Sequence, residues 1–229
     1  GLFERFPVPS IYAMHNWPAM QTGPVGINSG AMMAAADRVT IHIAGRGGHG
    51  AHAYQTVDVV LVAAHIITAV QGIVARNVRP LDSAVISLCA VQAGDLGAFS
   101  VLPGTATLVG TVRSFDPAVQ AMVEQRLKEL CSAIALGFGA TATVQYERIY
   151  PATINTESEA LFAGDVAERL VGADNVVRDL EPSMGAEDFS FMLQSKPGAY
   201  LRLGQGGGPS ACALHNSRYD FNDDILPLG

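Results

Sequence analysis

The sequence predicts an α/β protein in which a βαββαβ segment is inserted into a second α/β domain. The order β-α-β-β-α-β follows from alternating strands and two helical patterns over Arg38–Tyr150. After Pro151 the pattern changes and helical spacing returns. Almost half of the 229 residues are apolar and only 15% are charged, which supplies a core for a compact chain. We therefore expect one domain from residues 1–36 and 151–229, and an inserted domain at residues 37–150.

Four stretches of the inserted segment alternate apolar and polar residues, as strands with one buried face do. With one helix after the first strand and another after the third, they predict the ferredoxin-like arrangement. This is a four-stranded antiparallel sheet with both helices on one face. The four stretches are Arg38–Ile43, Ala84–Val91, Thr105–Phe115 and Thr141–Ile149.

Both helices of this segment carry start or stop signals. The first is expected over Asp58–Arg76, where apolar residues recur at helical spacing and either Thr56 or Asp58 is the cap. The second begins at Asp116–Pro117, because aspartate caps a helix and proline fits its first turn. It ends near Gly137.

The flanking segments contain fewer clear elements. We expect two short strands, one of which ends at His15, and two helices, the second opened by acidic residues suited to a first turn. A flexible glycine-rich loop should follow the second strand. The expected elements are Ile11–Met14, Glu159–Leu170, Met184–Phe189, Tyr200–Leu203 and the loop Gly204–Pro209.

Composition excludes several classes of protein. A net charge of −7 argues against nucleic acid and acidic membranes as partners. The three scattered cysteines form no C-x-x-C pair, so we expect a reducing cytoplasm rather than a disulfide framework. The apolar run Val59–Ala75 is short and interrupted by polar residues, which favours a buried helix over a membrane span. There is no signal-peptide pattern, and the missing first Met suggests a fragment or a processed chain.

Two histidines in similar contexts are candidate metal ligands. Met14-His15-Asn16 follows a strand, and Leu214-His215-Asn216 lies in a loop near the end of the chain. Neutral imidazole is the commonest metal ligand, and open α/β sheets place sites at the carboxyl ends of their strands. Spacing alone favours the alternative, that both are ordinary loop or buried histidines.

Other candidates each have a structural alternative. The loop Gly45–His52 matches no phosphate-binding pattern. Its two histidines, His49 and His52, are candidate hydrogen-bond donors to an oxyanion or a carboxylate, or else exposed residues of a turn. Glu187 and Asp188 are a candidate acid and base, or helix N-terminal charge. Arg113 is a candidate to bind a substrate carboxylate, or else part of a structural ion pair.

Six motifs taken together resemble one family. They run in family order over essentially the whole chain and look like the hippurate hydrolase and N-acyl-amino-acid amidohydrolase family, which includes the plant auxin-conjugate hydrolases. Each motif alone is weak, and jointly they are specific. They are Met14–Pro18, Gly45–His49, Gly110–Arg113, Ser183–Phe189, Leu214–Asn216 and Tyr219–Asp223.

The resemblance implies an incomplete metallopeptidase-like catalytic domain with an inserted ferredoxin-like lid that also forms a homodimer. It implies two divalent metal ions, zinc, manganese or similar, with His15 and His215 among the ligands. His49 would stabilise the oxyanion in a partner subunit, and Arg113 and Glu187 would contact the substrate. The implied reaction is hydrolysis of the amide of an N-acyl amino acid by metal-bound hydroxide.

The chain also departs from the family pattern. The Cys-Gly-His ligands and the Glu-Glu pair, which includes the general base, lie upstream of the segment that matches Gly1, so we expect the isolated chain to be inactive. The lid loop lacks its usual proline and second histidine, where Ala53 and Tyr54 stand, and it gains His52. Ser100 replaces an asparagine expected near the substrate carboxylate. Two alternatives stay open: a dipeptidase or carboxypeptidase of the same metallohydrolase group, and an inactive dimerisation module.

Overall fold

The computed structural model of this chain describes residues 1–206 and 212–229, which form two compact units. One unit comprises Gly1–Ala34 and Pro151–Gly229, and we call it the flanking unit. The other is continuous, Ala35–Tyr150, and we call it the inserted unit. Each unit has its own buried core and is described by itself.

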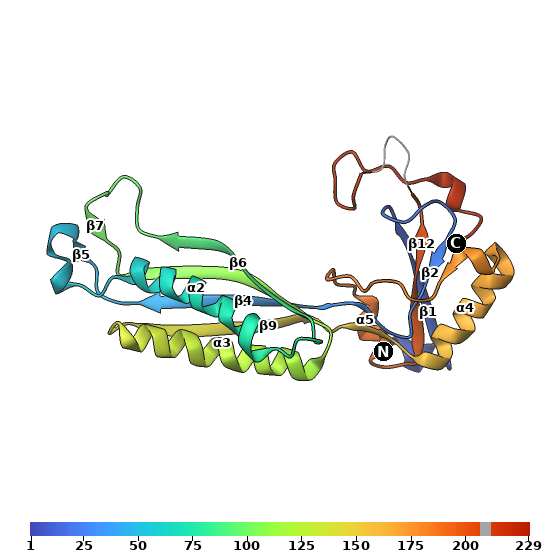
Figure 1. Cartoon of the computed structure of the whole chain (residues 1–229), viewed down its shortest axis with the longest axis horizontal. Helices are drawn as coiled ribbons and strands as arrows, with labels where there is room; N and C mark the ends of the chain where they lie inside the picture. The colour runs from blue at the N-terminus through green and yellow to red at the C-terminus, as the bar shows by residue number, and fades with distance from the viewer. Residues whose placement is uncertain (207–211) are drawn as a thin grey trace. The chain divides into compact units, whose positions relative to one another are not determined.

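The inserted unit has the element order βαββαβ. Its four long strands form an antiparallel sheet in the order β6-β8-β4-β9, and helices α2 and α3 lie on one face of that sheet (Figure 1). Beyond one end of the sheet, two short strands pair around a 3-10 turn. The elements are β4 (Ala35–Ala44), β5 (Gly48–His49), η1 (Gly50–Gln55), α2 (Val59–Asn77), β6 (Ala84–Ala93), β7 (Val101–Leu102), β8 (Thr105–Ser114), α3 (Pro117–Gly137) and β9 (Thr141–Tyr150).

Helix α2 is long and apolar enough to cross a membrane by length and composition, and it is the one described helix that meets this test. Its apolar side chains, however, pack on the sheet and on α3 in one continuous core. A third of the helix window is buried within the unit, and the buried residues recur at helical spacing. They are Val59, Val62, Ala63, Ile66, Val70 and Ile73.

The expected caps determine where both helices begin. Asp58 accepts hydrogen bonds from the backbone N–H groups of the residues that open α2. Asp116 accepts one from Ala118 N at 2.6 Å and precedes Pro117, the first residue of α3. The helix ends at Gly137, and Gly139 then takes a φ of 76°, which favours glycine.

Replacing Asp116 with alanine should lower the free energy of unfolding by ~0.5–2 kcal/mol, because the helix start loses a hydrogen-bond acceptor. Chemical denaturation measures this change. Asp116→Asn is the matched control, since its side-chain oxygen accepts the same bond. Equal losses from both substitutions would argue against the cap.

A carboxylate is buried inside the inserted unit. Asp37 on β4 is 1% exposed and accepts hydrogen bonds from Gln120 Nε2, at 2.9 and 2.8 Å, and from the Tyr146 hydroxyl at 2.5 Å. Burial raises the pKa of Asp37, although the hydrogen bonds from Tyr146 and Gln120 and the charge of Arg148 oppose that shift. The folded state therefore binds a proton at Asp37 more tightly than the unfolded chain does.

This proton affinity gives the unfolding free energy a pH dependence that Asp37→Asn should remove. A raised folded pKa contributes stability below the ordinary carboxyl pKa of ~4, and that stability is lost as pH rises through the raised value. Wild-type stability relative to Asp37→Asn should therefore fall with rising pH and level off above the raised pKa. Denaturant titrations of both proteins at several pH values measure it. A difference that grows with pH would show that the hydrogen bonds outweigh burial.

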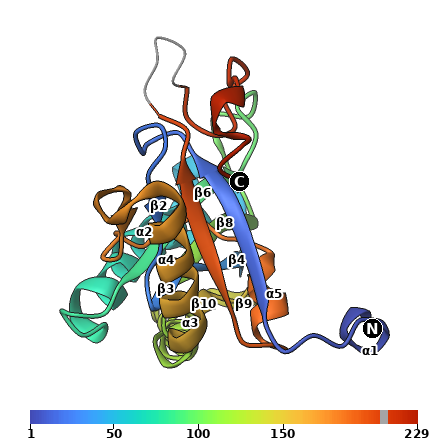
Figure 2. The ribbon, with the colours of Figure 1, turned by 90° about the vertical axis from the view of Figure 1, so that its right-hand side faces the viewer.

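The flanking unit is a small mixed sheet with helix α4 packed beside it (Figure 2). The sheet order is β1-β12-β2-β11, and β1 runs parallel to β12. A second pair of strands, β3 and β10, lies antiparallel. The elements are α1 (Leu2–Arg5), β1 (Ile11–Trp17), β2 (Val25–Gly26), β3 (Gly30–Met33), β10 (Thr153–Asn155), α4 (Glu157–Val171), η2 (Ala173–Asn175), β11 (Val176–Val177), α5 (Phe189–Leu193), β12 (Gly198–Gly204) and η3 (Asp223–Ile225).

One sequence prediction here is wrong. The helix expected to open at Met184 begins only at Phe189, so Glu187 lies in the loop before it. The reason is that the backbone of this loop bonds to another strand: Ala34 N donates to the carbonyl oxygens of Ser183 and Gly185. The loop expected at Gly204–Pro209 extends beyond the described residues.

Candidate metal and substrate site

His15 lies near the carboxyl end of β1, and its ring has a defined tautomer. The Nδ1 atom is 2.6 Å from the carbonyl oxygen of Asn16. Because a carbonyl only accepts, Nδ1 carries the proton and Nε2 of the neutral ring keeps its lone pair. Metal-binding histidines usually have this arrangement, in which the second nitrogen donates to a backbone carbonyl.

A hydrogen-bond network joins this end of β1 to the C-terminal segment. Asn16 Nδ2 donates to Gln205 Oε1 at 2.6 Å and to the hydroxyl of Tyr219, which itself donates to Gln205 Oε1 at 2.7 Å. Gln205 is buried directly after β12, and its Nε2 donates to the carbonyl of Asp220 at 2.9 Å. The network therefore attaches the segment that carries His215 to the carboxyl ends of β1 and β12.

His215 itself is exposed and has a φ of 66°, the one positive value at a non-glycine residue in the described chain. Such values are uncommon outside glycine, and histidine is among the residues enriched there. The turn around it is fixed by two backbone hydrogen bonds, Asn216 N to Ala213 O and Tyr219 N to Asn216 O. His215 therefore has an uncommon backbone conformation at a position where the family resemblance implies a metal ligand.

Tyr200 lies beside His15, and Glu187 acts on Tyr200 from the loop before α5. The ring of Tyr200 is 6.4 Å from the ring of His15 and 6.4 Å from that of Phe189. Its buried hydroxyl has no hydrogen-bond partner of normal geometry among the described residues. Burial, followed by the nearby Glu187 carboxylate, raises the pKa of Tyr200. Glu187 is thus close enough to this part of the site to act on it electrostatically.

Arg202 is a buried cation that sequence reasoning missed. It is 3% exposed, pairs in register with His15, and its guanidinium carbon lies 4.1 Å from the ring centroid of Trp17. It donates to the carbonyl oxygens of Met32 at 2.8 Å and Glu181 at 3.2 Å. Burial lowers its pKa. The sequence signal was an arginine in the otherwise apolar Tyr200–Leu203 strand.

His49 and Ser100 are brought together at one end of the inserted unit. The short strands β5 and β7 pair there, and Gly50 N donates to the carbonyl oxygen of Ser100 at 2.7 Å. His49 Nδ1 accepts a hydrogen bond from Ala51 N at 3.1 Å, so its proton is on Nε2. The exposed ring of His49 therefore presents Nε2–H as a hydrogen-bond donor, whereas His15 presents Nε2 as an acceptor. The ring of His49 lies 5.6 Å from the ring of His52.

Arg113 lies at the opposite end of the inserted unit, on strand β8 of the four-stranded sheet. The register pairs Ala44 with Thr105 and Ala36 with Arg113, so eight strand residues separate the two ends, about 26 Å at ~3.3 Å per residue. Its Nε donates to Thr111 Oγ1 at 3.1 Å, and it makes no ion pair with any described residue.

The metal-ligating set in this chain is small. Within residues 1–206 and 212–229, no three histidine, cysteine, aspartate or glutamate side chains gather closely enough to hold one ion. Protein metal sites usually need three or four ligands. The imidazole of His15 fits a divalent metal in chemistry and tautomer, and the described residues by themselves supply only part of a site.

Comparison with known proteins gives a consistent result. The family described as Peptidase family M20/M25/M40 matches residues 1–229. The chain is 35% identical over 226 residues to the hippurate hydrolase of Campylobacter jejuni, covering 99% of this chain and 58% of that protein. It is 30% identical over 225 residues to thermostable carboxypeptidase 1 of Saccharolobus solfataricus, covering 97% and 56%. A dinuclear metal binding peptidase of the M20 family from Bacillus subtilis superposes with a TM-score of 0.79 at 27% identity, covering 97% and 55%.

The chain thus spans a little more than half the length of each of these relatives. Its mixed α/β fold is similar to that of M20 dinuclear metallopeptidases, and the resemblance seen in the sequence motifs is confirmed. The chain belongs to peptidase family M20/M25/M40.

Proposed function

We propose that the complete protein is a metal-dependent amidohydrolase that cleaves the amide bond of N-acyl amino acids of the hippurate type. In this proposal the flanking unit is part of the catalytic domain. The inserted unit is a ferredoxin-like lid through which two copies form a homodimer. The identity with hippurate hydrolase over nearly the whole chain supports the substrate class.

The observation that carries this proposal is the tautomer of His15. Its Nδ1–H donates to the carbonyl of Asn16 at 2.6 Å, which leaves Nε2 as a ligand at the carboxyl end of a strand. The network through Gln205 and Tyr219 attaches the His215 loop to the same end of the sheet. We therefore assign His15 and His215 as two ligands of a two-metal site.

A divalent ion such as zinc or manganese would supply Lewis-acid polarisation of the amide carbonyl and lower the pKa of a bound water. The residues of this chain have separate tasks. His15 and His215 hold the metal, and Glu187, Arg113 and Ser100 contact the substrate. The His49 Nε2–H donates to the carbonyl oxygen as it gains negative charge.

The positions of His49 and Arg113 support an arrangement that involves two subunits. Arg113 lies at one end of the four-stranded sheet, and His49 lies on the separate strand pair β5-β7 beyond the other end. The two ends of the four-stranded sheet are about 26 Å apart along the strands at ~3.3 Å per residue, which is too far for one small substrate to touch both residues. If both contact substrate, they contact different substrate molecules. We infer that His49 serves the active site of a partner subunit.

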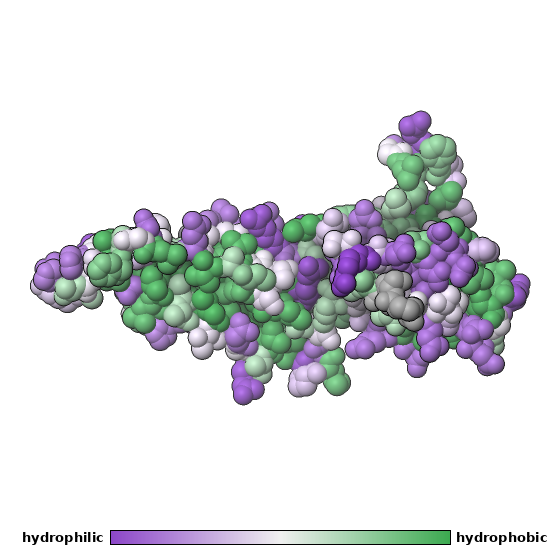
Figure 3. Space-filling model, turned by 90° about the horizontal axis from the view of Figure 1, so that it is seen from above, coloured by the Kyte–Doolittle hydropathy of each residue, from purple (hydrophilic) through white to green (hydrophobic). Residues whose placement is uncertain are grey.

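The edge strand β6 is the proposed dimer contact. It is an outer strand of the inserted sheet, and Val91 on it is 56% exposed. Apolar residues gather over this unit on the side where β6 lies in Figure 1 (Figure 3). An open edge with apolar side chains is suited to pairing with a second copy.

Metal removal and substrate comparison test the proposal. The complete protein should lose hydrolysis of hippurate after treatment with a chelator and regain it when zinc or manganese is added back. The same preparation should hydrolyse hippurate faster than unmodified dipeptides. Full activity in the metal-free protein would contradict the proposal.

Faster hydrolysis of dipeptides would instead favour a carboxypeptidase or dipeptidase. The 30% identity with thermostable carboxypeptidase 1 supports this second candidate. Stable dimers of the complete protein with neither metal nor turnover would identify an inactive dimerisation module.

A further inference from the structure

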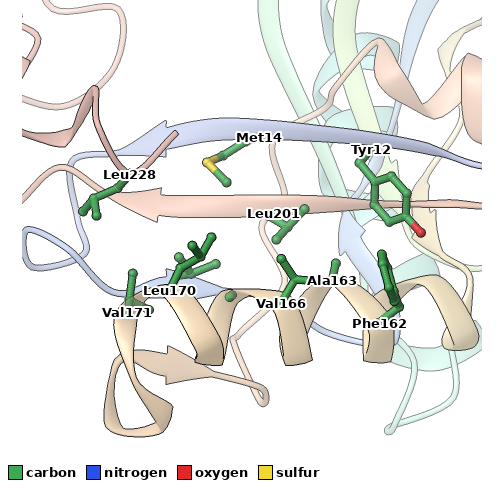
Figure 4. Close-up of a pocket in the computed structure, with 11 residues that line it drawn as sticks. Tyr12, Met14, Phe162, Ala163, Val166, Leu170, Val171, Leu201 and Leu228 are labelled. Atoms are coloured by element: carbon green, nitrogen blue, oxygen red, sulfur yellow. The ribbon is translucent and has the colours of Figure 1, made fainter.

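Two polar side chains of β12, Tyr200 and Arg202, lie on the face of the flanking sheet away from α4. Leu201 and Leu203 pack in the core shared with α4, and Leu201 points into an apolar groove beside that helix (Figure 4). Because successive side chains of a strand alternate between its faces, Tyr200 and Arg202 point the other way. His15 pairs in register with Arg202 on the neighbouring strand β1, so it lies on the same face as these two residues.

The buried guanidinium of Arg202 contacts only neutral groups. Its two Nη atoms donate to the carbonyl oxygens of Glu181 at 3.2 Å and Met32 at 2.8 Å. Nη2 is also 3.1 Å from the sulfur of Met33, and the group lies over the ring of Trp17. Its Nε has no hydrogen-bond partner among the described residues, and none of their carboxylates forms an ion pair with it. A buried cation without a counter-ion is destabilising, and methionine could fill its space without that cost, so packing alone does not explain the arginine.

The segment that Arg202 holds leads directly to Glu187. Residues 181–188 form the loop before α5, and we call it the Glu187 loop. Arg202 donates to the first carbonyl of this loop and to the carbonyl of Met32 at the end of β3. Ser183 N donates to the same Met32 carbonyl at 3.0 Å, so the loop and the guanidinium share one acceptor. The start of the Glu187 loop is therefore attached to β12 through Arg202.

The far end of the Glu187 loop lies next to the same strand, at Tyr200. Burial, followed by the Glu187 carboxylate, raises the pKa of the Tyr200 hydroxyl, so the two groups are close together. Glu187 Oε1 also accepts a hydrogen bond from Phe189 N at 3.3 Å, where α5 begins. The ring of Tyr200 is 6.4 Å from the ring of His15. Both ends of the loop therefore meet neighbouring residues of β12, on the face that carries His15.

We propose that Arg202 is a positioning residue that sets the place of the Glu187 carboxylate relative to His15. It acts through the Glu187 loop and touches neither the metal nor the substrate. The planar guanidinium suits this task because it donates to two carbonyl groups in a fixed geometry, which the single ammonium of lysine does not. This inference rests on the proposed function, in which Glu187 contacts the substrate and His15 binds the metal.

Hydrogen exchange tests this attachment without any need for activity. The complete protein and its Arg202→Met variant are compared in metal-free buffer by mass spectrometry of peptides that cover the Glu187 loop. Methionine fills the site but donates no hydrogen bond. We expect the backbone amides of the loop to exchange at least ~10-fold faster in the variant, because exchange requires local opening. Peptides from α4 should keep the wild-type rate.

Leu203→Val is the matched control, because Leu203 is a buried neighbour on the same strand whose side chain faces α4. It should leave exchange in the Glu187 loop unchanged. Equal loop exchange in wild type and Arg202→Met would overturn the proposal. A uniform increase over the loop and α4 would also overturn it, since Arg202 would then support the fold as a whole. If Arg202→Met does not fold, Arg202→Lys takes its place, because lysine cannot reproduce the paired contacts.

A double-mutant cycle then tests whether Arg202 acts through Glu187. Arg202→Met alone should lower kcat/KM for hippurate at least ~10-fold with unchanged metal content, because a small misplacement of a contacting group slows the reaction strongly. In a Glu187→Gln background the same substitution should cost less than ~3-fold, since residues that act together are not additive. Equal factors in the two backgrounds would overturn the proposal. Leu203→Val should give equal factors in both.

The two measurements separate this inference from the proposed function. Faster exchange confined to the Glu187 loop, in a protein that does not hydrolyse hippurate, would contradict the proposed function and support the inference. Hydrolysis of hippurate by a protein whose loop exchange does not respond to Arg202→Met would support the proposed function and overturn the inference.

Discussion

Replacing His15 with alanine in the complete protein is expected to lower metal affinity by at least ~100-fold. Mutating a residue that only hydrogen-bonds to a metal ligand already lowers metal affinity by about 10–100-fold, and His15 is proposed to be a ligand itself. Hydrolysis of N-acyl amino acids should be lost with the metal. The Nδ1–H of His15 donates to the Asn16 carbonyl at 2.6 Å, which leaves Nε2 as the proposed ligand atom. Alanine removes that atom.

Metal content by elemental analysis and turnover of hippurate measure the effect. His42→Ala is the matched control, since His42 is an exposed histidine on β4. His215→Ala should behave like His15→Ala. A variant that kept full metal content and full activity would remove that histidine from the ligand set.

His15→Gln separates the ligand role from a structural one. Glutamine can keep a polar contact with this part of the chain, but it is a poor replacement for an imidazole ligand. We expect its thermal stability to remain close to that of wild type in metal-free buffer, while metal affinity falls as it does for alanine. Equal losses of stability in metal-free buffer would instead indicate that the ring of His15 supports the fold.

The elements of the inserted unit could be predicted from sequence because local rules determine them. Asp58 and Asp116 cap the helices as their sequence context indicates. The alternating strands also pair in the order that the βαββαβ pattern favours. The assignment of this unit as a lid stays a prediction, since fold alone does not determine function.

The flanking unit was harder to predict because its structure depends on contacts between distant segments. The loop at Ser183–Gly185 resembles a helix start, but its carbonyl groups bond to Ala34, 149 residues away along the chain. Similarly, Asn16 gains its role only by meeting Gln205 and Tyr219. No local sequence pattern predicts these long-range contacts. His15 and His215 were singled out instead by their match to the family motifs, which does not require knowledge of those contacts.

His49→Ala in the complete protein should lower kcat by ~10²–10³-fold with little change in metal content, the usual effect of removing one oxyanion donor. The Ala51 N–H bond to Nδ1 leaves Nε2–H as the donor that the substitution deletes. His52→Ala is the matched control, because its ring lies only 5.6 Å away on the same exposed turn. Steady-state kinetics with hippurate should show the loss in kcat more than in KM. A similar loss from both variants would assign the effect to the turn as a whole.

Mixing two inactive variants then decides which subunit His49 serves. A subunit with His49→Ala keeps its ligands, and a subunit with His15→Ala keeps its donor. If His49 acts across the dimer, each mixed dimer has one site with both groups. Random exchange should therefore restore about a quarter of wild-type activity in a symmetric dimer. If His49 acts within its own subunit, every site in the mixture lacks one group and activity stays at the level of the separate variants. The roughly 26 Å between the two ends of the sheet, at ~3.3 Å per residue, favours the first outcome.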